Sequence, residues 1–288
     1  MNIKKLFYWW MDERQWIYLK KERGDPWPWT ADKILQQYKF TNVYRQQDAV
    51  TRKLTEELRR VHYDYGDHKK LLFRIYVFRI FNWPDTYYEL APLIDARRFR
   101  PEQFRQIILD RKARKDQMFT GAYIVTNNGS TTPKHELYTE ACLIARDMIY
   151  KSRLVKEIEN EQTLEYATQA LRLLPMVGAF ISYEMVTDLR WTPILEHAED
   201  IYTWANPGPG AKRGLNRIFS PSHDKNDNRR VNGKQDLLEE MRTLLNEAPN
   251  YTNLTLEMRD IEHSLCEFDK YMRVKNNEGR PRSKYHHG

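Results

Sequence analysis

Apolar side chains recur every three or four positions along most of the chain, which is the spacing of amphipathic helices. In residues 41–61 the apolar positions Val50, Leu54 and Leu58 alternate with arginine and glutamate, so one helix is predicted there. Residues 71–81 (LLFRIYVFRIF) are too apolar for a surface helix and are expected to cross the core. Further helices are predicted at residues 134–154, 163–174, 235–248 and 255–274.

An extended chain is predicted at one place, residues 121–126 (GAYIVT), which a turn-rich segment follows. The pattern as a whole therefore predicts an all-α, mainly helical fold. Segments rich in proline and glycine separate the helices at residues 23–30 (RGDPWPWT) and 204–214 (WANPGPGAKRG).

The composition adds a basic charge balance and a high aromatic content. The 288 residues include 47 lysines and arginines against 40 acidic residues, and the formal net charge is +7. Aromatic residues make up 13% of the chain, among them 8 tryptophans and 18 tyrosines. Such a chain suits a partner whose phosphates are neutralised and whose bases stack on rings. An ordinary aromatic core beneath a mildly basic surface would have the same composition.

Membrane-spanning and disulfide-rich proteins are excluded. No stretch approaches the roughly 18 consecutive apolar residues of a membrane-spanning helix, so no membrane partner is expected. The N-terminus has an aromatic cluster but neither the apolar core nor the cleavage site of a signal peptide. Two cysteines, Cys142 and Cys266, are too few for a disulfide framework or a cysteine-rich zinc site. We therefore expect a reducing cytoplasm, and no cofactor is evident.

The segment Leu173–Phe180 (LLPMVGAF) joins two predicted helices. Pro175 is expected to stop the first helix, and Gly178 to supply a permissive conformation before the second. This is the pattern of a helix-hairpin-helix, in which backbone N–H groups, here of Val177, Gly178 and Ala179, bind a DNA phosphate at a helix N-terminus. The alternative is an ordinary tight turn between two helices.

Asp200 comes about twenty residues after this hairpin and precedes the segment GPGAKRGLNR. In helix-hairpin-helix DNA glycosylases an aspartate follows the hairpin at a similar distance, and Asp200 resembles it. Its carboxylate would act as a general base or stabilise positive charge. Asp188, on the second hairpin helix, is a rival carboxylate, and an N-cap or surface position is the alternative for Asp200.

Three glycines, Gly208, Gly210 and Gly214, lie in the segment GPGAKRG. Small residues let backbone N–H groups approach a phosphate, and Lys212 and Arg213 supply positive charge. The segment is not a Walker loop, because the spacing and the Ser or Thr after the lysine are missing. It is predicted to be a loop, either one that binds phosphate or a plain loop with exposed basic residues.

Cys266 lies beside the apolar stripe of the last predicted helix, one turn from Glu262 and Lys270. Lys270 and His263 would lower the pKa of its thiol, whereas Glu262 and Asp269 would raise it. Cys266 is either a nucleophile or a small buried hydrophobic side chain.

Arg45, Asp48 and Arg52 recur along one side of the helix predicted at residues 41–61. They would form either an intrahelical ion-pair ladder or a phosphate clamp. The ladder alone would contribute less than ~1 kcal/mol to stability.

Several segments together resemble a known family. They are RGDPWPWTADKILQQYKF, FTGAYIVTNNGSTTPK, LPMVGAFISYEMVTDLRWT, TWANPGPGAKRGLNRIF and LTLEMRDIEHSLCEFDKYMRV, in this order. They are similar to the bacteriophage α-glutamyl/putrescinyl-thymine pyrophosphorylases, also described as amino acid:DNA transferases. The resemblance covers residues 12–283 and implies a two-lobed helical fold like that of helix-hairpin-helix DNA glycosylases. With it we divide the chain into an aromatic and Pro/Trp segment packed on the core (1–30), a helical lobe (31–160) and a helix-hairpin-helix lobe with the C-terminal helix (161–288), acting as one functional unit.

The resemblance also implies a function. In such phages a kinase phosphorylates or pyrophosphorylates 5-hydroxymethyluracil within double-stranded DNA. The transferase then replaces the phosphate with an amine, which helps the viral DNA escape restriction in the host cytoplasm. Glycine is our first choice of donor, followed by glutamate, serine and putrescine.

The residues are compatible with that chemistry. The modified base must leave the stack, so base flipping is expected. Mg²⁺ on a pyrophosphate leaving group is left open, although no set of residues has metal-ligand spacing. The candidate residues are Lys212, Arg213, Arg45 and Arg52 for the leaving phosphate, and Asp200, Glu262 and His263 for the proton of the amine.

Two routes and two other functions stay open. The amine displaces the phosphate directly, or Cys266 first adds to C6 of the uracil. A DNA glycosylase would use the same hairpin and Asp200 but would leave an abasic site. A reader of modified DNA would bind without turnover.

Overall fold

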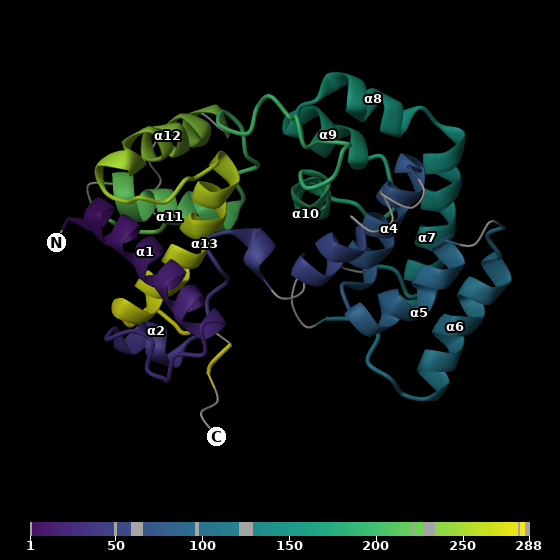
Figure 1. The fold of residues 1–288 in the computed structure, drawn as a ribbon, viewed down its shortest axis with the longest axis horizontal. Coiled ribbons are helices and arrows are strands. Elements are labelled where there is room, and N and C mark those ends of the chain that lie inside the picture. The colour runs from purple at the N-terminus through teal and green to yellow at the C-terminus, as the bar shows by residue number, and fades with distance from the viewer. Residues whose placement is uncertain are drawn as a thin grey trace. The chain divides into compact units, whose positions relative to one another are not determined.

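The computed structural model describes residues 2–48, 51–58, 66–95, 98–120, 129–220, 222–226, 234–281 and 283–285. Within these ranges the regular secondary structure is helical, and the β-type pairing is an isolated antiparallel bridge between Tyr38 and Lys284. The predicted all-α fold class is therefore confirmed (Figure 1). The extended chain predicted at residues 121–126 lies outside the described residues.

The helices follow one another along the chain with short connections. Residues 51–58 are helical as well. The elements are α1 (Ile3–Glu22), α2 (Lys33–Gln37), the 3₁₀ helix η1 (Arg45–Gln47), α4 (His68–Phe81), α5 (Pro84–Asp95), α6 (Pro101–Ala113), α7 (Lys134–Lys151), α8 (Leu154–Glu161), α9 (Leu164–Leu171), α10 (Ala179–Leu189), α11 (Pro209–Phe219), α12 (Lys234–Glu247), the 3₁₀ helix η2 (Ala248–Asn250) and α13 (Met258–Lys275).

The chain forms two compact units. The terminal unit combines Met1–Thr51 with Asp200–Gly288, and the central unit is Arg52–Glu199. These units differ from the predicted lobes, because the C-terminal helix α13 shares a unit with α1, while the hairpin helices α9 and α10 belong to the central unit. That the whole chain acts as one functional unit stays a prediction.

The single helix predicted at residues 41–61 is wrong. Residues 41–44 are irregular, η1 follows, and a separate helical stretch covers residues 51–58. Asp48 explains the interruption: its carboxylate accepts a hydrogen bond from the Asn42 N–H at 3.0 Å and another from Arg45 at 3.0 Å. Such local side-chain bonds to the backbone compete with helix formation.

Other boundaries differ by a few residues. Ser152 and Arg153 separate α7 from α8, so the helix predicted at residues 134–154 is two helices. The N-cap of α13 is Glu257, whose side chain forms a capping box with Asp260, and not Thr255.

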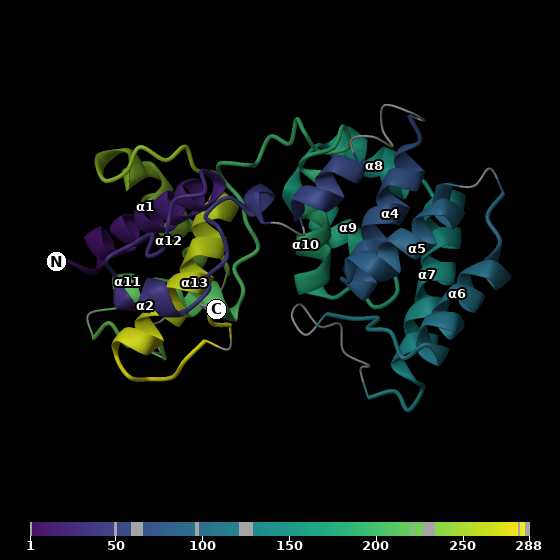
Figure 2. The same ribbon diagram turned by 60° about the horizontal axis from the view of Figure 1, so that its bottom comes forward.

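The core of the terminal unit forms where α1 and α11 pack on α13 (Figure 2). The apolar stripe predicted on the last helix is buried, as expected. Aromatic rings join α1 to it: the Phe268 ring lies 5.2 Å from Phe7 and 5.5 Å from Trp10. At the chain end, Lys39 donates its N–H to Ser283 O and Tyr285 donates to Gln37 O, so residues 283–285 are held against residues 37–39.

The core of the central unit is α4, which contacts α5, α7, α8 and α10 (Figures 1 and 2). Every residue from Leu71 to Phe81 is buried, which confirms the predicted core-crossing helix. Its buried Arg79 donates to both carboxylate oxygens of Asp188 at 2.6 Å. Arg79 also donates to Glu184 at 3.0 Å, so Asp188 is one of two carboxylates that pair with a buried arginine.

Candidate functional site

The predicted hairpin turn joins α9 to α10 in the central unit. α9 ends at Leu171, four residues before the predicted stop at Pro175. The left-handed residue of the turn is Met176, with φ +60°, whereas Gly178 has φ −85° and is the N-cap of α10. The expectation that Gly178 supplies the permissive conformation is therefore wrong. The Tyr76 hydroxyl of α4 donates to Pro175 O at 2.7 Å and anchors the turn.

The residues of the turn differ in solvent exposure. Val177 is buried at 6% exposure, while Gly178 and Ala179 are exposed. Two apolar side chains flank the turn in the open: Leu173 is 73% exposed and Phe180 is 51% exposed. Contact of Val177, Gly178 and Ala179 with a DNA phosphate stays a prediction.

Asp200 begins the second part of the terminal unit, in a turn. Its carbonyl accepts hydrogen bonds from Thr203 at 3.0 Å and Trp204 at 2.8 Å. The next residue, Ile201, accepts a bond from the N–H of Met258, so the turn is tied to the start of α13. The predicted catalytic role of Asp200 is not tested by this geometry.

The glycine-rich segment is not a loop. Residues 209–219 form α11, with Gly208 as the N-cap. A Cβ on Gly210 would lie 2.7 Å from Cys266 Sγ, and a Cβ on Gly214 would lie 2.4 Å from the Leu265 carbonyl oxygen. Gly210 and Gly214 therefore allow α11 to pack closely on α13. The predicted loop is wrong, whereas contact of Gly208, Gly210 and Gly214 with DNA stays a prediction.

Of the two basic residues in this segment, Arg213 forms an ion pair and Lys212 is exposed to solvent. Arg213 donates to Asp269 at 2.9 Å, and the fully buried Arg217 also contacts Asp269, at 3.3 Å. Arg213 thus helps to compensate a buried carboxylate between α11 and α13. Lys212 is exposed. Its predicted contact with a leaving phosphate stays a prediction.

The surroundings of Cys266 disfavour its thiolate. Burial, together with the negative charges of Glu262 and Glu267, raises the pKa of the thiol well above its usual value. The Sγ atom lies 3.6 Å from Glu262 Oε1 and against Gly210. Both observations favour a packing role for Cys266, as a small side chain where α11 crosses α13, over the role of a nucleophile.

His263 is the centre of a polar cluster inside the terminal unit. Its Nε2 lies 2.5 Å from the Thr41 hydroxyl, and the Thr41 N–H donates to Glu267 at 3.3 Å. Glu267 also accepts a bond from Lys270. The surrounding protein and the charges of four cations (Arg45, Arg14, Lys270 and Arg259) hold the pKa of His263 well below its usual value. His263 is therefore neutral at neutral pH.

We call this set the His263 cluster; its members are Arg14, Thr41, Arg45, Asp48, His263, Glu267 and Lys270. The structure thus brings two predicted site residues, Arg45 and His263, into one charged cluster. Glu262, one helical position before His263, is buried and contacts Cys266. Arg52 belongs to a different helical stretch, in the central unit, and Arg45 and Asp48 form an ion pair at 3.0 Å.

Sequence reasoning missed Arg14, which is 4% exposed. It follows Trp10 by one helical turn, and its Cζ lies 4.3 Å from the Trp10 ring. An arginine at that spacing from a buried tryptophan is the signal that would have identified it.

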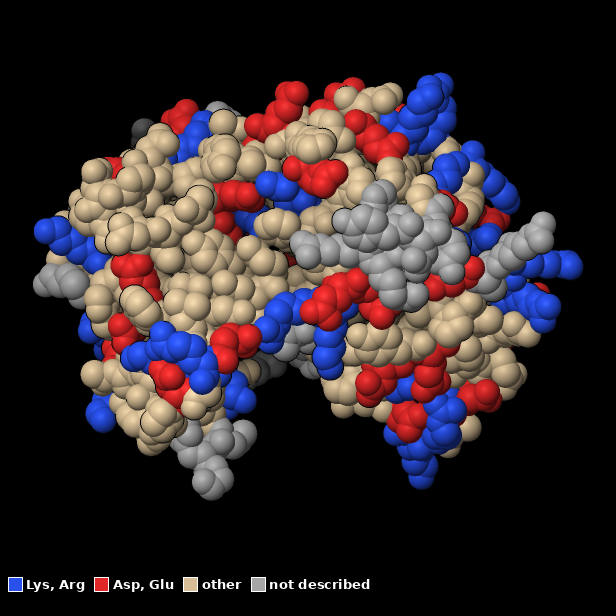
Figure 3. Space-filling model, viewed as in Figure 1, with Lys and Arg blue, Asp and Glu red and all other residues tan. Residues whose placement is uncertain are grey.

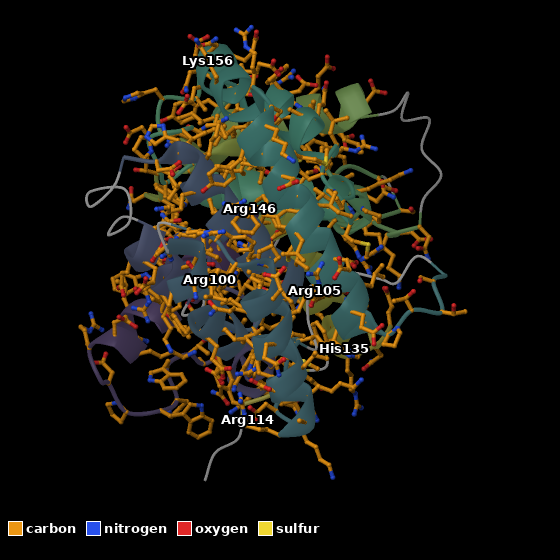
Figure 4. All side chains as sticks on the ribbon, turned by 90° about the vertical axis from the view of Figure 1, so that its right-hand side faces the viewer. Arg100, Arg105, Arg114, His135, Arg146 and Lys156 are labelled. Carbon is orange, nitrogen blue, oxygen red and sulfur yellow. The ribbon has the colours of Figure 1, made fainter. Side chains whose placement is uncertain are left out.

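Basic and acidic side chains are mixed along α6, α7 and α8 of the central unit. Figure 4 shows six basic or imidazole side chains that lie on α6, α7 and α8 or cap the ends of α6: Arg100, Arg105, Arg114, His135, Arg146 and Lys156. Arg105 pairs with Glu140 at 2.7 Å, and Arg114 pairs with Glu89 and Asp116. Within the described ranges, Arg100 and Lys156 have no ion-pair partner and are exposed. On the face in Figure 3, acidic and basic side chains are interspersed.

Neither a metal site nor a membrane span is found in the part of the chain that the structure describes. No group of three or more histidine, cysteine, aspartate or glutamate residues there is arranged to hold a metal ion. No helix there is both long and apolar enough to cross a membrane. The Mg²⁺ left open by the sequence is not tested.

Comparisons with known proteins point to one family. A family model described as "5-hmdU DNA kinase, helical domain" matches residues 1–280. The 5-hmdU DNA kinase of Bacillus phage SP10 is 27% identical over 234 residues, which cover 72% of this chain and 34% of that protein. The chain therefore spans about a third of the length of the curated relative it matches. No solved structure matches it.

Proposed function

The chain belongs to the family of helical domains of 5-hmdU DNA kinases, and on this basis we propose that it recognises 5-hydroxymethyl-2′-deoxyuridine in phage DNA and takes part in thymidine hypermodification. The match of the family model to residues 1–280 carries this proposal. The place of action would be the host cytoplasm, where phage DNA is copied and modified.

Recognition would involve the central unit. In this proposal Arg100 and Lys156, which are exposed, contact DNA phosphates. The hairpin turn approaches the duplex, and Leu173, at 73% exposure, enters the base stack as an apolar wedge. Extrusion of the base costs a few kcal/mol, which such a wedge would offset in part.

Phosphorylation of the 5-hydroxymethyl group is the first candidate reaction, because the relative is named for it. The sequence contains no G-x-x-x-x-G-K-[ST] stretch, the phosphate-binding loop of P-loop kinases. In this proposal residues 1–288 present the base, and the phosphate donor is not bound by a P-loop of these residues.

Replacement of a phosphate on the base by an amine, glycine first, is the second candidate reaction. His263 is the weakest of its proposed proton acceptors, because burial and four neighbouring cations disfavour the imidazolium that it would form. Asp200 and Glu262 are the further proton acceptors proposed, and Arg45 would face the leaving phosphate. Direct displacement is preferred, since the pKa of Cys266 is raised.

Mass spectrometry of nucleosides tests both reactions together. A duplex with 5-hydroxymethyluracil in place of thymine is incubated with the protein, ATP and Mg²⁺, and the same duplex after phosphorylation is incubated with the protein and glycine. Gain of a phosphoryl group supports the first reaction, and a glycine adduct with release of phosphate supports the second. Abasic sites would instead identify a DNA glycosylase.

Binding provides the decisive control. The protein is expected to bind the 5-hydroxymethyluracil duplex more tightly than the thymine duplex, whether or not it turns over alone. Asp200→Asn should abolish any turnover, while Glu199→Gln, a change at the exposed neighbouring residue, should not. Equal affinity for the two duplexes would contradict the proposal.

A further inference from the structure

The guanidinium of Arg14 is buried without a hydrogen-bond partner. Arg14 lies on α1 and is 4% exposed. Its Nε, Nη1 and Nη2 atoms find no acceptor among the residues that the structure describes. A buried ion is normally paired, because an uncompensated charge away from water is costly. The stacking of Arg14 on Trp10 at 4.3 Å satisfies none of its five N–H groups.

The neighbouring carboxylates are already engaged with other donors. Asp48 accepts from Arg45 at 3.0 Å and from the Asn42 N–H at 3.0 Å. Glu267 accepts from Lys270 and from the Thr41 N–H. The charges of Glu267 and Asp48 act on Arg14 from a distance, and burial lowers the pKa of Arg14 to about 10, so it remains a cation at neutral pH.

The balance of charge in the His263 cluster is positive. Three cations, Arg14, Arg45 and Lys270, face two carboxylates, Asp48 and Glu267, and His263 is neutral. Arg259, which also faces His263, contacts its own carboxylates, Glu257 and Asp260. An anion next to Arg14 would neutralise the excess positive charge of the cluster.

We propose that Arg14 is the base of an anion site in the terminal unit that binds a terminal phosphate group. Three empty guanidinium nitrogens with five N–H donors match the three free oxygens of a terminal phosphate better than the two of a carboxylate. The depth of Arg14 excludes a phosphodiester within a nucleic-acid backbone, because that group is tethered on two sides. The ligand is either inorganic phosphate or a phosphate monoester on a slim substituent.

The irregular segment of residues 39–44 packs beside these groups: the Phe40 ring lies 5.9 Å from the Trp10 ring on which Arg14 stacks. Thr41 in this segment contacts both His263 and Glu267, so a bound phosphate would lie within a network that links α1, this segment and α13. The site is argued from the terminal unit alone and goes beyond the recognition of DNA proposed above.

Thermal unfolding of the full chain with added inorganic phosphate tests the site without any DNA. Sodium chloride at matched ionic strength is the reference, and sodium acetate is the comparison anion. At a hundredfold excess over Kd, phosphate is expected to raise the wild-type Tm by about 5 °C. Because DNA is absent, failure of this test leaves the proposed function untouched, and failure of the DNA experiments leaves this site untouched.

Variants of two arginines on the same helix separate the site from general charge effects. Arg14→Met is expected to lose the phosphate shift and, without phosphate, to melt no lower than the wild type, since it removes an uncompensated charge. Arg23→Gln, at the exposed C-cap of α1, should keep the full shift. Arg14→Lys keeps the charge but loses the planar fork, so it should show a smaller shift; it carries the test if Arg14→Met does not fold.

Three results would overturn the assignment. They are no phosphate shift in the wild type beyond that of chloride, an undiminished shift in both Arg14→Met and Arg14→Lys, or an acetate shift as large as that of phosphate.

Discussion

Gly214 of α11 lies against the backbone of Leu265 of α13, so closely that a Cβ at Gly214 would be 2.4 Å from the Leu265 carbonyl oxygen. One helical turn earlier, Gly210 lies against the side chain of Cys266, whose Sγ would be 2.7 Å from an added Cβ. The two glycines share one face of α11. This face determines how closely the helix that carries Lys212 and Arg213 approaches the helix that carries His263.

Gly214→Ala should therefore destabilise the chain. The clash is with backbone, which cannot rotate away, so the cost is expected at or above the upper end of the roughly 1–3 kcal/mol typical of overpacking. Chemical denaturation followed by circular dichroism measures it. Gly208→Ala is the matched control, since no atom lies within 4 Å of its added Cβ, and it should cost less than about 1 kcal/mol. Equal midpoints for the two variants would contradict the close crossing.

Cys266 should behave as a packing residue and not as a nucleophile. Because burial and two carboxylates raise the pKa of its thiol, alkylation by iodoacetamide at neutral pH should be much slower than for an exposed cysteine. The labelling is done in Cys142→Ala, in which Cys266 is the remaining thiol of the sequence. Cys266→Ala should retain whatever DNA modification the wild type performs. Loss of turnover in a folded Cys266→Ala protein would restore the covalent route.

His263 should make the terminal unit sensitive to acid. The folded chain disfavours the imidazolium of His263, whereas the unfolded chain takes up the proton at the ordinary pKa. Stability should therefore fall as the pH drops below about 6.5, by up to about 1.4 kcal/mol per pH unit from this residue. Denaturation curves between pH 5 and 8, as an approximate window about that value, measure the slope.

His263→Gln is the control for that slope, because glutamine does not titrate. His135, whose pKa is also lowered by burial, contributes in both proteins and cancels in the comparison. The same pH slope in His263→Gln as in the wild type would show that His263 is not the group responsible.

Arg100 and Lys156 should contribute to the salt dependence of DNA binding. Replacing both with glutamine should reduce the slope of log K against log salt by about 0.9 for each DNA phosphate that the variant no longer neutralises. Fluorescence anisotropy with a labelled duplex at several salt concentrations measures it. Arg105→Gln, which removes an arginine already paired with Glu140, should change the slope less. A double variant indistinguishable from Arg105→Gln would place the DNA elsewhere.

The sequence predicted best those helices whose apolar pattern is unambiguous. Residues 71–81 of α4 are mostly apolar around the whole helix and are all buried, and the stripe of α13 from Met258 to Met272 is buried as its spacing indicates. In both helices the pattern of apolar residues and the observed burial agree, because the spacing of apolar residues within a single helix is enough to predict which of its faces is buried.

The sequence failed where a residue's role depends on a distant partner. Gly210 and Gly214 resemble a phosphate loop until α13 is known to lie against them. Arg45 and Arg52 share a helical spacing, but the bonds made by Asp48 interrupt the helix between them. α1 is not among the predicted helices, because its tryptophans and tyrosines surround a mixture of charges that shows no clear stripe.

The terminal unit is assembled from the two ends of the chain. The Tyr8 hydroxyl donates to Leu244 O, and the Thr252 hydroxyl donates to Asp12, across 236 and 240 positions of sequence. During synthesis the aromatic face of α1 therefore cannot pack on α13 until the more than 200 residues between them have been made, whereas the central unit is formed by one continuous segment. Contacts of such long range slow folding. We expect a nascent chain in which the central unit is folded while α1 is still exposed and prone to aggregate, so chaperone protection would matter most before α13 is made.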